Sequence, residues 1–195
     1  MASPAAAIGL RVKTGKAIAI VVRGTPRAPE VLKRDELILA DHDKPDTWQP
    51  YHPVMELAWT EAQKAVRPIA QIIEKTARKA MAALVAEVRA AGYEVRGIGI
   101  AGRGSQDPAR IGNTHIRAHA AEGRLFREVL ESGADACGIA KRVFLEKEIY
   151  QKGAPEIGCS AHELKTRVAA LRTPAVRPWS AEERCAALAA WLMLK

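Results

Sequence analysis

Residues 8–24 read IGLRVKTGKAIAIVVRG, two apolar runs on either side of a short basic segment, KTGK. Runs rich in Ile and Val around a glycine are typical of two strands joined by a tight turn. A phosphate-binding P-loop needs four residues between its first glycine and a Gly-Lys pair, then Ser or Thr at the start of a helix. Here five residues separate Gly9 from Gly15, Ala17 follows Lys16, and the next residues form a strand pattern. The stretch therefore predicts a β-hairpin and not a P-loop.

The pattern beyond the hairpin predicts a third strand, a long loop, a long helix and a fourth strand. Residues 30–40 (EVLKRDELILA) predict the third strand, and three prolines make residues 41–53 a loop. Apolar residues at steps of three and four predict a helix over residues 54–91. Pro68 should kink or split that helix, because it removes one backbone donor. Residues 94–102 (EVRGIGIAG) predict the fourth strand.

The second half of the sequence alternates helices with one further strand. After a polar loop, we expect a helix from about residue 115 to 133, a strand over 140–149, and helices over 160–171 and 180–194. The order predicts an α/β fold in one domain over residues 1–195. Its mixed five-stranded sheet has three antiparallel strands followed by two parallel crossovers, with helices on its faces.

Composition limits the possible classes of protein. The chain has 195 residues, a net charge of +8 and a pI of about 9.6, which is compatible with a polyanionic partner such as nucleic acid. No apolar stretch reaches the ~18 residues of a membrane span, so we expect a cytoplasmic protein with no membrane partner. Residues 1–29 contain only basic charges, at Arg11, Lys13, Lys16, Arg23 and Arg27.

Glycines and cysteines both favour packing roles over chemistry. Gly97, Gly99 and Gly102 formally match a dinucleotide-binding fingerprint, but they lie inside the predicted strand and no helix opens at the third glycine. Close packing of this strand under a helix is the better interpretation. The three cysteines are widely spaced, which argues against a disulfide framework and a cysteine zinc site, and Cys185 should be a buried thiol.

The segment HIRAHAAE places His115, His119 and Glu122 on one face of a helix. Histidines at this spacing can bind a metal, but a zincin motif needs Glu after the first histidine, where Ile116 stands. Two surface histidines without a metal are therefore the preferred interpretation. A ligand-binding role stays open, because Glu122 shares its side with Phe126 and the helix begins beyond the carboxyl end of a strand.

A second candidate group is a pair of carboxylates, Glu146 and Glu148, near the end of the last predicted strand. Alternation along a strand would put both on one face, where paired carboxylates can bind magnesium or move protons. A solvated strand end is an equally good interpretation.

Three segments, IGLRVKTGKAIAIVV (8–22), GIGIAGRG (97–104) and AEERCAALAAWL (181–192), resemble the ribonuclease H-like superfamily, and the first hairpin resembles RuvC-type Holliday-junction resolvases. The resemblance implies acidic residues on the first strand, the fourth strand and the last helix that hold two magnesium ions for phosphodiester cleavage. Here the first-strand position is Arg11, and residues 101–103 contain no acid. Glu182 and Glu183 remain in the last helix, where a capping box with Ser180 already explains Glu183. The resemblance thus implies this fold with a degenerate acidic centre.

These observations favour a non-catalytic binding protein for nucleic acid or another phosphate-bearing ligand, with no cofactor. Arg11, Lys13 and Arg103 would supply the positive charge, with His119 and Glu122 nearby.

Two alternatives stay open. One is a hydrolase or nuclease with a relocated centre, with Mg²⁺ or Mn²⁺ as possible ions, built from His115, His119, Glu122, Glu146 and Glu148. The other is a structural subunit of a homo-oligomer whose interface is the last helix, which contains Trp191.

Overall fold

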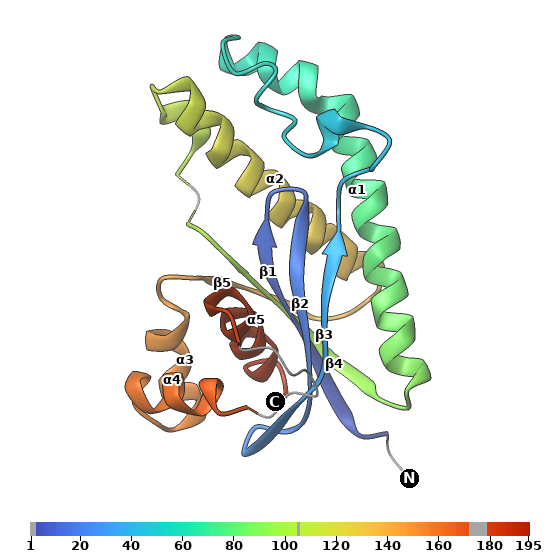
Figure 1. Cartoon of the computed structure of the whole chain (residues 1–195), viewed down its shortest axis with the longest axis vertical. Coiled ribbons are helices and arrows are strands. Elements are labelled where there is room, and N and C mark those ends of the chain that lie inside the picture. The colour runs from blue at the N-terminus through green and yellow to red at the C-terminus, as the bar shows by residue number, and fades with distance from the viewer. Residues whose placement is uncertain (1–2, 105, 172–178) are drawn as a thin grey trace.

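The predicted hairpin lies at the centre of a mixed five-stranded sheet in the computed structural model, which describes residues 3–104, 106–171 and 179–195 (Figure 1). The strands are β1 (Ala5–Lys13), β2 (Lys16–Thr25), β3 (Ala28–Ile38), β4 (Glu94–Gly102) and β5 (Lys141–Leu145), in the order β3-β2-β1-β4-β5. β1 pairs with β2, and β2 with β3, in antiparallel fashion, whereas β4 is parallel to both β1 and β5. The predicted fold class is confirmed.

Thr14 and Gly15 make the turn between β1 and β2. Gly15 has φ of +74°, a left-handed conformation that glycine adopts without strain. A Cβ at this position would lie 2.2 Å from Cε3 of Trp48, so the turn is also covered by that ring. The carbonyl of Gly15 accepts hydrogen bonds from the backbone of Leu39 and Ala40, which anchors the chain leaving β3. KTGK therefore reverses the chain, as the sequence predicts.

Helices cover both faces of the sheet (Figure 1). The long helices α1 (Trp59–Ala90) and α2 (Thr114–Ala136) pack on one face. The other face carries α5 (Ala181–Trp191), with α3 (Ile149–Ile157) and α4 (Ala161–Ala169) packed outside it. Two short 3₁₀ helices, Pro45–Thr47 and Pro108–Arg110, lie in the loops before α1 and α2. None of the helices in the described ranges is long and apolar enough to cross a membrane.

The alternation of side chains on β1 divides the core into two layers. Ile8 and Leu10 point toward α1 and α2, while Gly9 and Arg11 point to the face that α5 covers. A Cβ on Gly9 would lie 1.8 Å from the carbonyl oxygen of Ala186, and one on Gly99 would lie 2.3 Å from that of Ala189. The backbone of α5 therefore rests directly on the sheet, which confirms the packing role expected for Gly99, whereas a Cβ on Gly102 would meet only Val12 at an ordinary 3.6 Å.

The first long helix differs from the prediction in two ways. It begins at Trp59 instead of residue 54, because residues 51–57 form turns. It also runs unbroken through Pro68, so of the expected kink or split the split is absent. Pro68 is exposed, and so is Lys64, whose carbonyl loses its helical donor and can bond to water instead. The helix is thus not split. Gly92, with φ of +87°, follows its last turn.

The region after β5 also differs from the prediction. The last strand ends at Leu145 instead of residue 149, and α3 follows at once over a segment not predicted as helix. The missed helix contains Gly153 and Pro155 within its nine residues, and both are poor helix formers.

The last helix does not provide the exposed interface expected of an oligomer subunit. Trp191 is 3 % exposed within the chain, and its indole Nε1 donates a hydrogen bond to the carbonyl of Pro26. Most residues of α5 are buried between the sheet and α3–α4, so this expectation of an interface is wrong.

Candidate functional site

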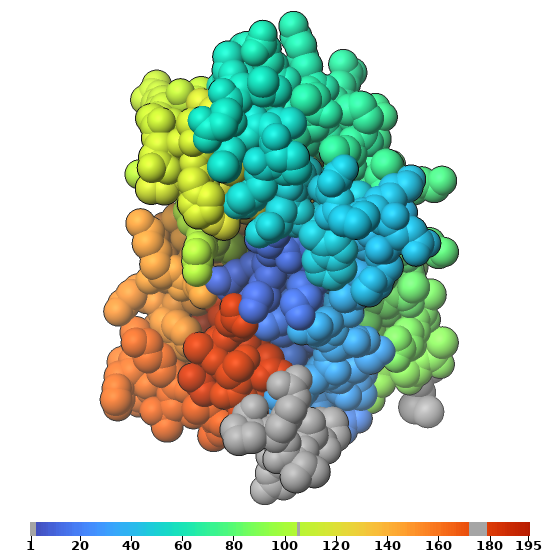
Figure 2. Space-filling model, turned by 45° about the horizontal axis from the view of Figure 1, so that its top comes forward, coloured from blue at the N-terminus to red at the C-terminus, as the bar shows by residue number. Residues whose placement is uncertain are grey.

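A cleft of about 350 Å³ opens at the carboxyl ends of β1 and β4. These two strands are parallel neighbours, so their carboxyl ends meet at one edge of the sheet, a usual place for ligands in α/β folds. Figure 2 shows the tip of the β1–β2 hairpin, in deep blue, between α5, in red, and the yellow-green start of α2. The lining residues are Arg11, Val12, Lys13, Thr14, Arg103, His119, Gly123 and Glu182. Four of the eight predicted site residues therefore meet here.

Arg11 forms the floor of this cleft and is only 5 % exposed. Its Nη2 donates to Oε2 of Glu146 at 2.6 Å, and its Nη1 donates to the carbonyl of Val12. Its Nε has no hydrogen-bond partner among the described residues. Glu146 directly follows β5, so the ion pair ties the central strand to the end of an outer one. The positive charge of Arg11 is balanced inside the protein.

Of the two cations at the rim of the cleft, one forms an ion pair with a carboxylate among the described residues and the other does not. Lys13 forms an ion pair with Glu182 at 2.9 Å, with both side chains 36 % exposed. Arg103 is exposed just after β4, and within the described part of the chain no carboxylate pairs with it. The excess positive charge of the cleft therefore comes mainly from Arg103.

The basic N-terminal segment does not form an unopposed positive surface. Lys16 pairs with Glu36 at 2.9 Å, and Arg23 pairs with Glu30 at 2.9 Å. Both carboxylates belong to β3, which lies beside β2 and compensates its charges. The segment looked basic because its acidic partners come later in the sequence.

The cleft does not fit the pair of magnesium ions that the resemblance implies. Magnesium needs oxygen ligands, usually including one or two carboxylates. The first-strand position holds the buried guanidinium of Arg11, and its neighbour on β4 is Ala101. Among the described residues that line the cleft, Glu182 is the only carboxylate, and Lys13 already neutralises it. Glu183 lies outside this cleft. Its carboxylate accepts a hydrogen bond from the backbone N–H of Ser180, at the N-terminus of α5, and forms an ion pair with Arg34 at 2.7 Å.

The expected carboxylate pair of Glu146 and Glu148 is not present. Because β5 ends at Leu145, strand alternation does not apply to either residue. Glu146 binds Arg11, whereas Glu148 precedes α3 and pairs with Lys152 at 2.6 Å. Each carboxylate therefore neutralises a different cation, and this part of the predicted hydrolytic centre is wrong.

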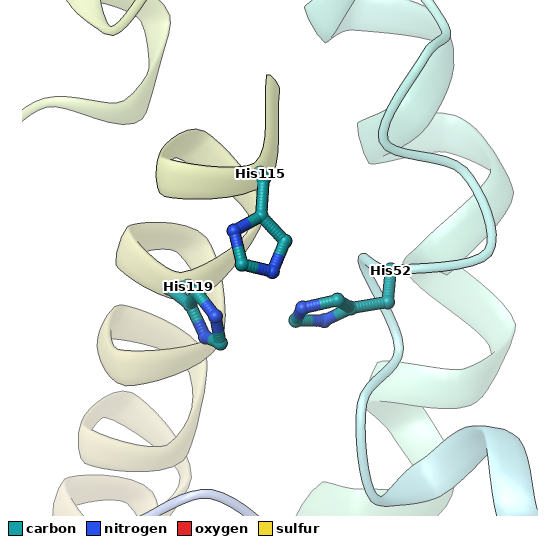
Figure 3. A group of neighbouring side chains, drawn as sticks. All are labelled: His52, His115 and His119. Carbon is teal, nitrogen blue, oxygen red and sulfur yellow. The ribbon is translucent and has the colours of Figure 1, made fainter. Parts of the chain in front are cut away.

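A separate cluster of three histidines lies at the start of α2, beside the cleft (Figure 3). His115 and His119 lie one turn apart on α2 and are exposed, as the surface interpretation expected. His52 faces them from the loop that precedes α1 and is half-buried. The ring centroids are 4.5 Å apart for His115 and His119, 4.7 Å for His52 and His119, and 5.3 Å for His52 and His115.

Glu122 lies beneath these rings and is fully buried at 0 % exposure. Its Oε1 accepts hydrogen bonds from Nδ1 of His52 at 2.7 Å and from the backbone N–H of Tyr51 at 3.2 Å. Its Oε2 has no hydrogen-bond partner among the described residues, and Nδ1 of His119 lies 3.9 Å from it. The predicted trio of His115, His119 and Glu122 thus meets, with His52 as an additional member.

Contacts between the loop and α2 explain why His52 is here. Nη2 of Arg117 donates to the carbonyls of Met55 and Leu57 at 2.7 and 2.9 Å. Thr114 donates its hydroxyl to Glu56 at 2.9 Å. No periodic pattern in the sequence predicts contacts across some 60 residues. A histidine in a proline-rich loop gave no signal of this placement.

Cys185 is the buried thiol that the sequence predicts, at 4 % exposure. Burial raises its pKa to about 12, and the nearby carboxylate of Glu146 adds to this effect. The thiol is therefore protonated at neutral pH and is not a nucleophile.

Neither the family models nor the curated proteins match this sequence. Solved structures do match, among them two of RuvC. The structure titled T. thermophilus RuvC in complex with Holliday junction substrate aligns with a TM-score of 0.56 and 8 % identity, covering 96 % of this chain and 92 % of that chain. The Thermus thermophilus RuvC structure aligns with a TM-score of 0.52 and 11 % identity, with the same two coverages. At such low identity the likeness concerns the fold alone. The chain has the ribonuclease H-like fold of the RuvC type.

Proposed function

We propose that this protein binds nucleic acid through its phosphodiester backbone in the cleft at the carboxyl ends of β1 and β4, without two-metal cleavage. The observation that carries the proposal is the replacement of an acidic centre by a cationic one. Arg11, Lys13 and Arg103 line the cleft, against a single lining carboxylate, Glu182. A cleft of about 350 Å³ suits a group the size of a nucleotide.

The three cations have different roles in this proposal. Arg11 is held by Glu146, so it sets the shape of the floor and adds little net charge. Arg103 is exposed and supplies the main phosphate contact. Lys13 can exchange Glu182 for a phosphate oxygen, since exposed ion pairs contribute only about 0–1 kcal/mol. One or two phosphates would therefore be neutralised.

The fold adds support for nucleic acid over a small phosphate ligand. One structure with the same fold is a complex of RuvC with a Holliday junction. The cleft also lies open at the surface beside α2, whose residues His119 and Gly123 line it, so a longer ligand can extend beyond it.

The test is fluorescence anisotropy with labelled duplex and four-way-junction DNA across a series of salt concentrations. Because each neutralised phosphate releases counterions, affinity should fall as salt rises. Arg103→Ala should weaken binding and lower the slope of log K against log salt by about 1. The matched control is Arg89→Ala, which removes an exposed arginine at the far end of α1 and should leave binding unchanged.

The same mixtures, incubated with Mg²⁺ or Mn²⁺, test the absence of cleavage. Intact DNA is expected, because the cleft lacks the carboxylates that hold two metals. Absence of binding at low salt, or equal losses in Arg103→Ala and Arg89→Ala, would contradict binding in the cleft. Metal-dependent cutting would contradict the non-catalytic part alone.

A further inference from the structure

Three of the five histidines of the chain gather at one place, from two distant segments. His52, His115 and His119 each offer a ring nitrogen, and these three atoms all lie within 4.8 Å of one another. Figure 3 shows His115 and His119 on one side and His52 opposite, with the rings converging on a shared space. Neutral imidazole nitrogens converging in this way are suitable ligands for a transition metal.

The buried carboxylate of Glu122 supplies a second, independent observation. It accepts a hydrogen bond from Nδ1 of His52, which in the neutral imidazole leaves the lone pair on Nε2. A carboxylate that orients a histidine through its other ring nitrogen is the usual outer partner of a metal ligand. Its Oε2 is buried without a hydrogen bond among the described residues, and a buried anion is stabilised by a nearby cation.

We propose that His52, His115 and His119 bind a zinc ion, with Glu122 as the positioning residue for His52. Zinc prefers imidazole nitrogen at about 2.0–2.1 Å in a tetrahedral arrangement, which places the ligand atoms about 3.4 Å apart. The three nitrogens lie within 4.8 Å of one another, so each pair needs to approach by at most about 1.4 Å, and the rings of His115 and His119 are exposed. Magnesium and calcium prefer oxygen ligands and do not suit three imidazoles.

This site is open to further ligands on the solvent side. Three protein ligands leave the fourth tetrahedral position to water or to a ligand oxygen. His119 also lines the basic cleft, so the zinc would lie at its edge. The proposal does not depend on nucleic-acid binding, because Arg11, Lys13 and Arg103 are not zinc ligands.

Zinc binding is measured by calorimetry on the full chain after treatment with a chelator that is then removed. The expected result is one zinc ion per chain, together with a rise in melting temperature, since the folded site alone binds the ion. His115→Ala and His52→Ala should each lower the affinity at least 10-fold. Glu122→Gln should lower it by about 10–100-fold, as other outer-shell changes do.

His162→Ala, which removes an exposed histidine on α4, is the matched control and should bind zinc like the native chain. His115→Ala keeps the test decisive if the changes at half-buried His52 or buried Glu122 impair folding, because His115 is exposed. Cobalt gives a second readout, since tetrahedral Co²⁺ has intense visible absorption that should disappear in His115→Ala. Absence of zinc binding at micromolar concentrations would overturn the proposal. Equal binding by native chain and His115→Ala would also overturn it.

Discussion

Removing the carboxylate that holds Arg11 should destabilise the protein and strengthen its binding of anions. In Glu146→Ala the guanidinium of Arg11, with a side chain only 6 % exposed, loses its partner at 2.6 Å. Two unit charges about 4 Å apart attract by about 4 kcal/mol at an effective dielectric near 20. Because the Glu146 side chain is 33 % exposed, solvent already screens part of this attraction. We therefore expect a loss of about 2–3 kcal/mol, below the range for fully buried pairs.

Urea unfolding measures this loss, with the slope of the transition as a check that the same surface is exposed. The double variant Arg11→Met/Glu146→Ala should recover part of the stability, because no charge is left buried without a partner. DNA binding by Glu146→Ala, measured well below its melting temperature, should increase, since the cleft gains one net positive charge. A change in stability below 0.5 kcal/mol would refute the argument that this ion pair holds the floor of the cleft.

Three further outcomes follow from the packing and charge of other residues. Gly9→Ala should lower the free energy of unfolding in urea by about 3 kcal/mol or more, because the added Cβ would lie 1.8 Å from a carbonyl oxygen of α5. The control Gly112→Ala, whose Cβ would have nothing within 4 Å, should change the free energy of unfolding by less than about 1 kcal/mol. In native protein at pH 8, Cys185 should be alkylated more slowly than the other two thiols, because burial raises its pKa to about 12; equal rates in mass spectrometry would contradict this. The Arg142 guanidinium lowers the pKa of Glu156 from its ordinary value of 4.5 to about 2. This carboxylate therefore contributes its full stabilisation at pH values above 4.5 and loses it as the pH falls toward 2. Glu156→Gln should therefore lose less stability than the native chain between pH 5 and pH 2, and parallel losses in acid unfolding would contradict the assignment.

Local patterns were sufficient to predict most of the fold. The hairpin around Gly15, the strand over residues 94–102 and the capping box at Ser180 follow from periodicity, turn chemistry and side-chain acceptors within a few residues. Elements whose composition opposed their structure were missed or misjudged. The helix α3 contains Gly153 and Pro155, which have low helix propensity. Its helical conformation therefore depends on packing against α4 and α5.

The candidate site was predictable only where its residues follow a strand or share a helix face. Arg11 and Arg103 meet because parallel β1 and β4 end together. The partner of Arg11, by contrast, is 135 residues away, and His52 lies 70 residues from Glu122. Such contacts depend on the packing of a loop or a strand end, which leaves no local signal. Charge runs were misleading for the same reason, since Glu30 and Glu36 balance the basic hairpin from a neighbouring strand.

The position of α5 has a consequence for the order in which the protein can mature during its synthesis. β1 and β2 leave the ribosome before the helices that cover them, and their apolar faces toward α1 and α2 can be covered first. Their opposite faces have no cover until residues 181–191 emerge, since α5 provides most of that layer. Between the emergence of β2 and that of α5, the nascent chain therefore carries strands with one bare apolar face, a form prone to aggregation. We therefore expect the nascent chain to depend on a chaperone until α5 has emerged, and no longer afterwards.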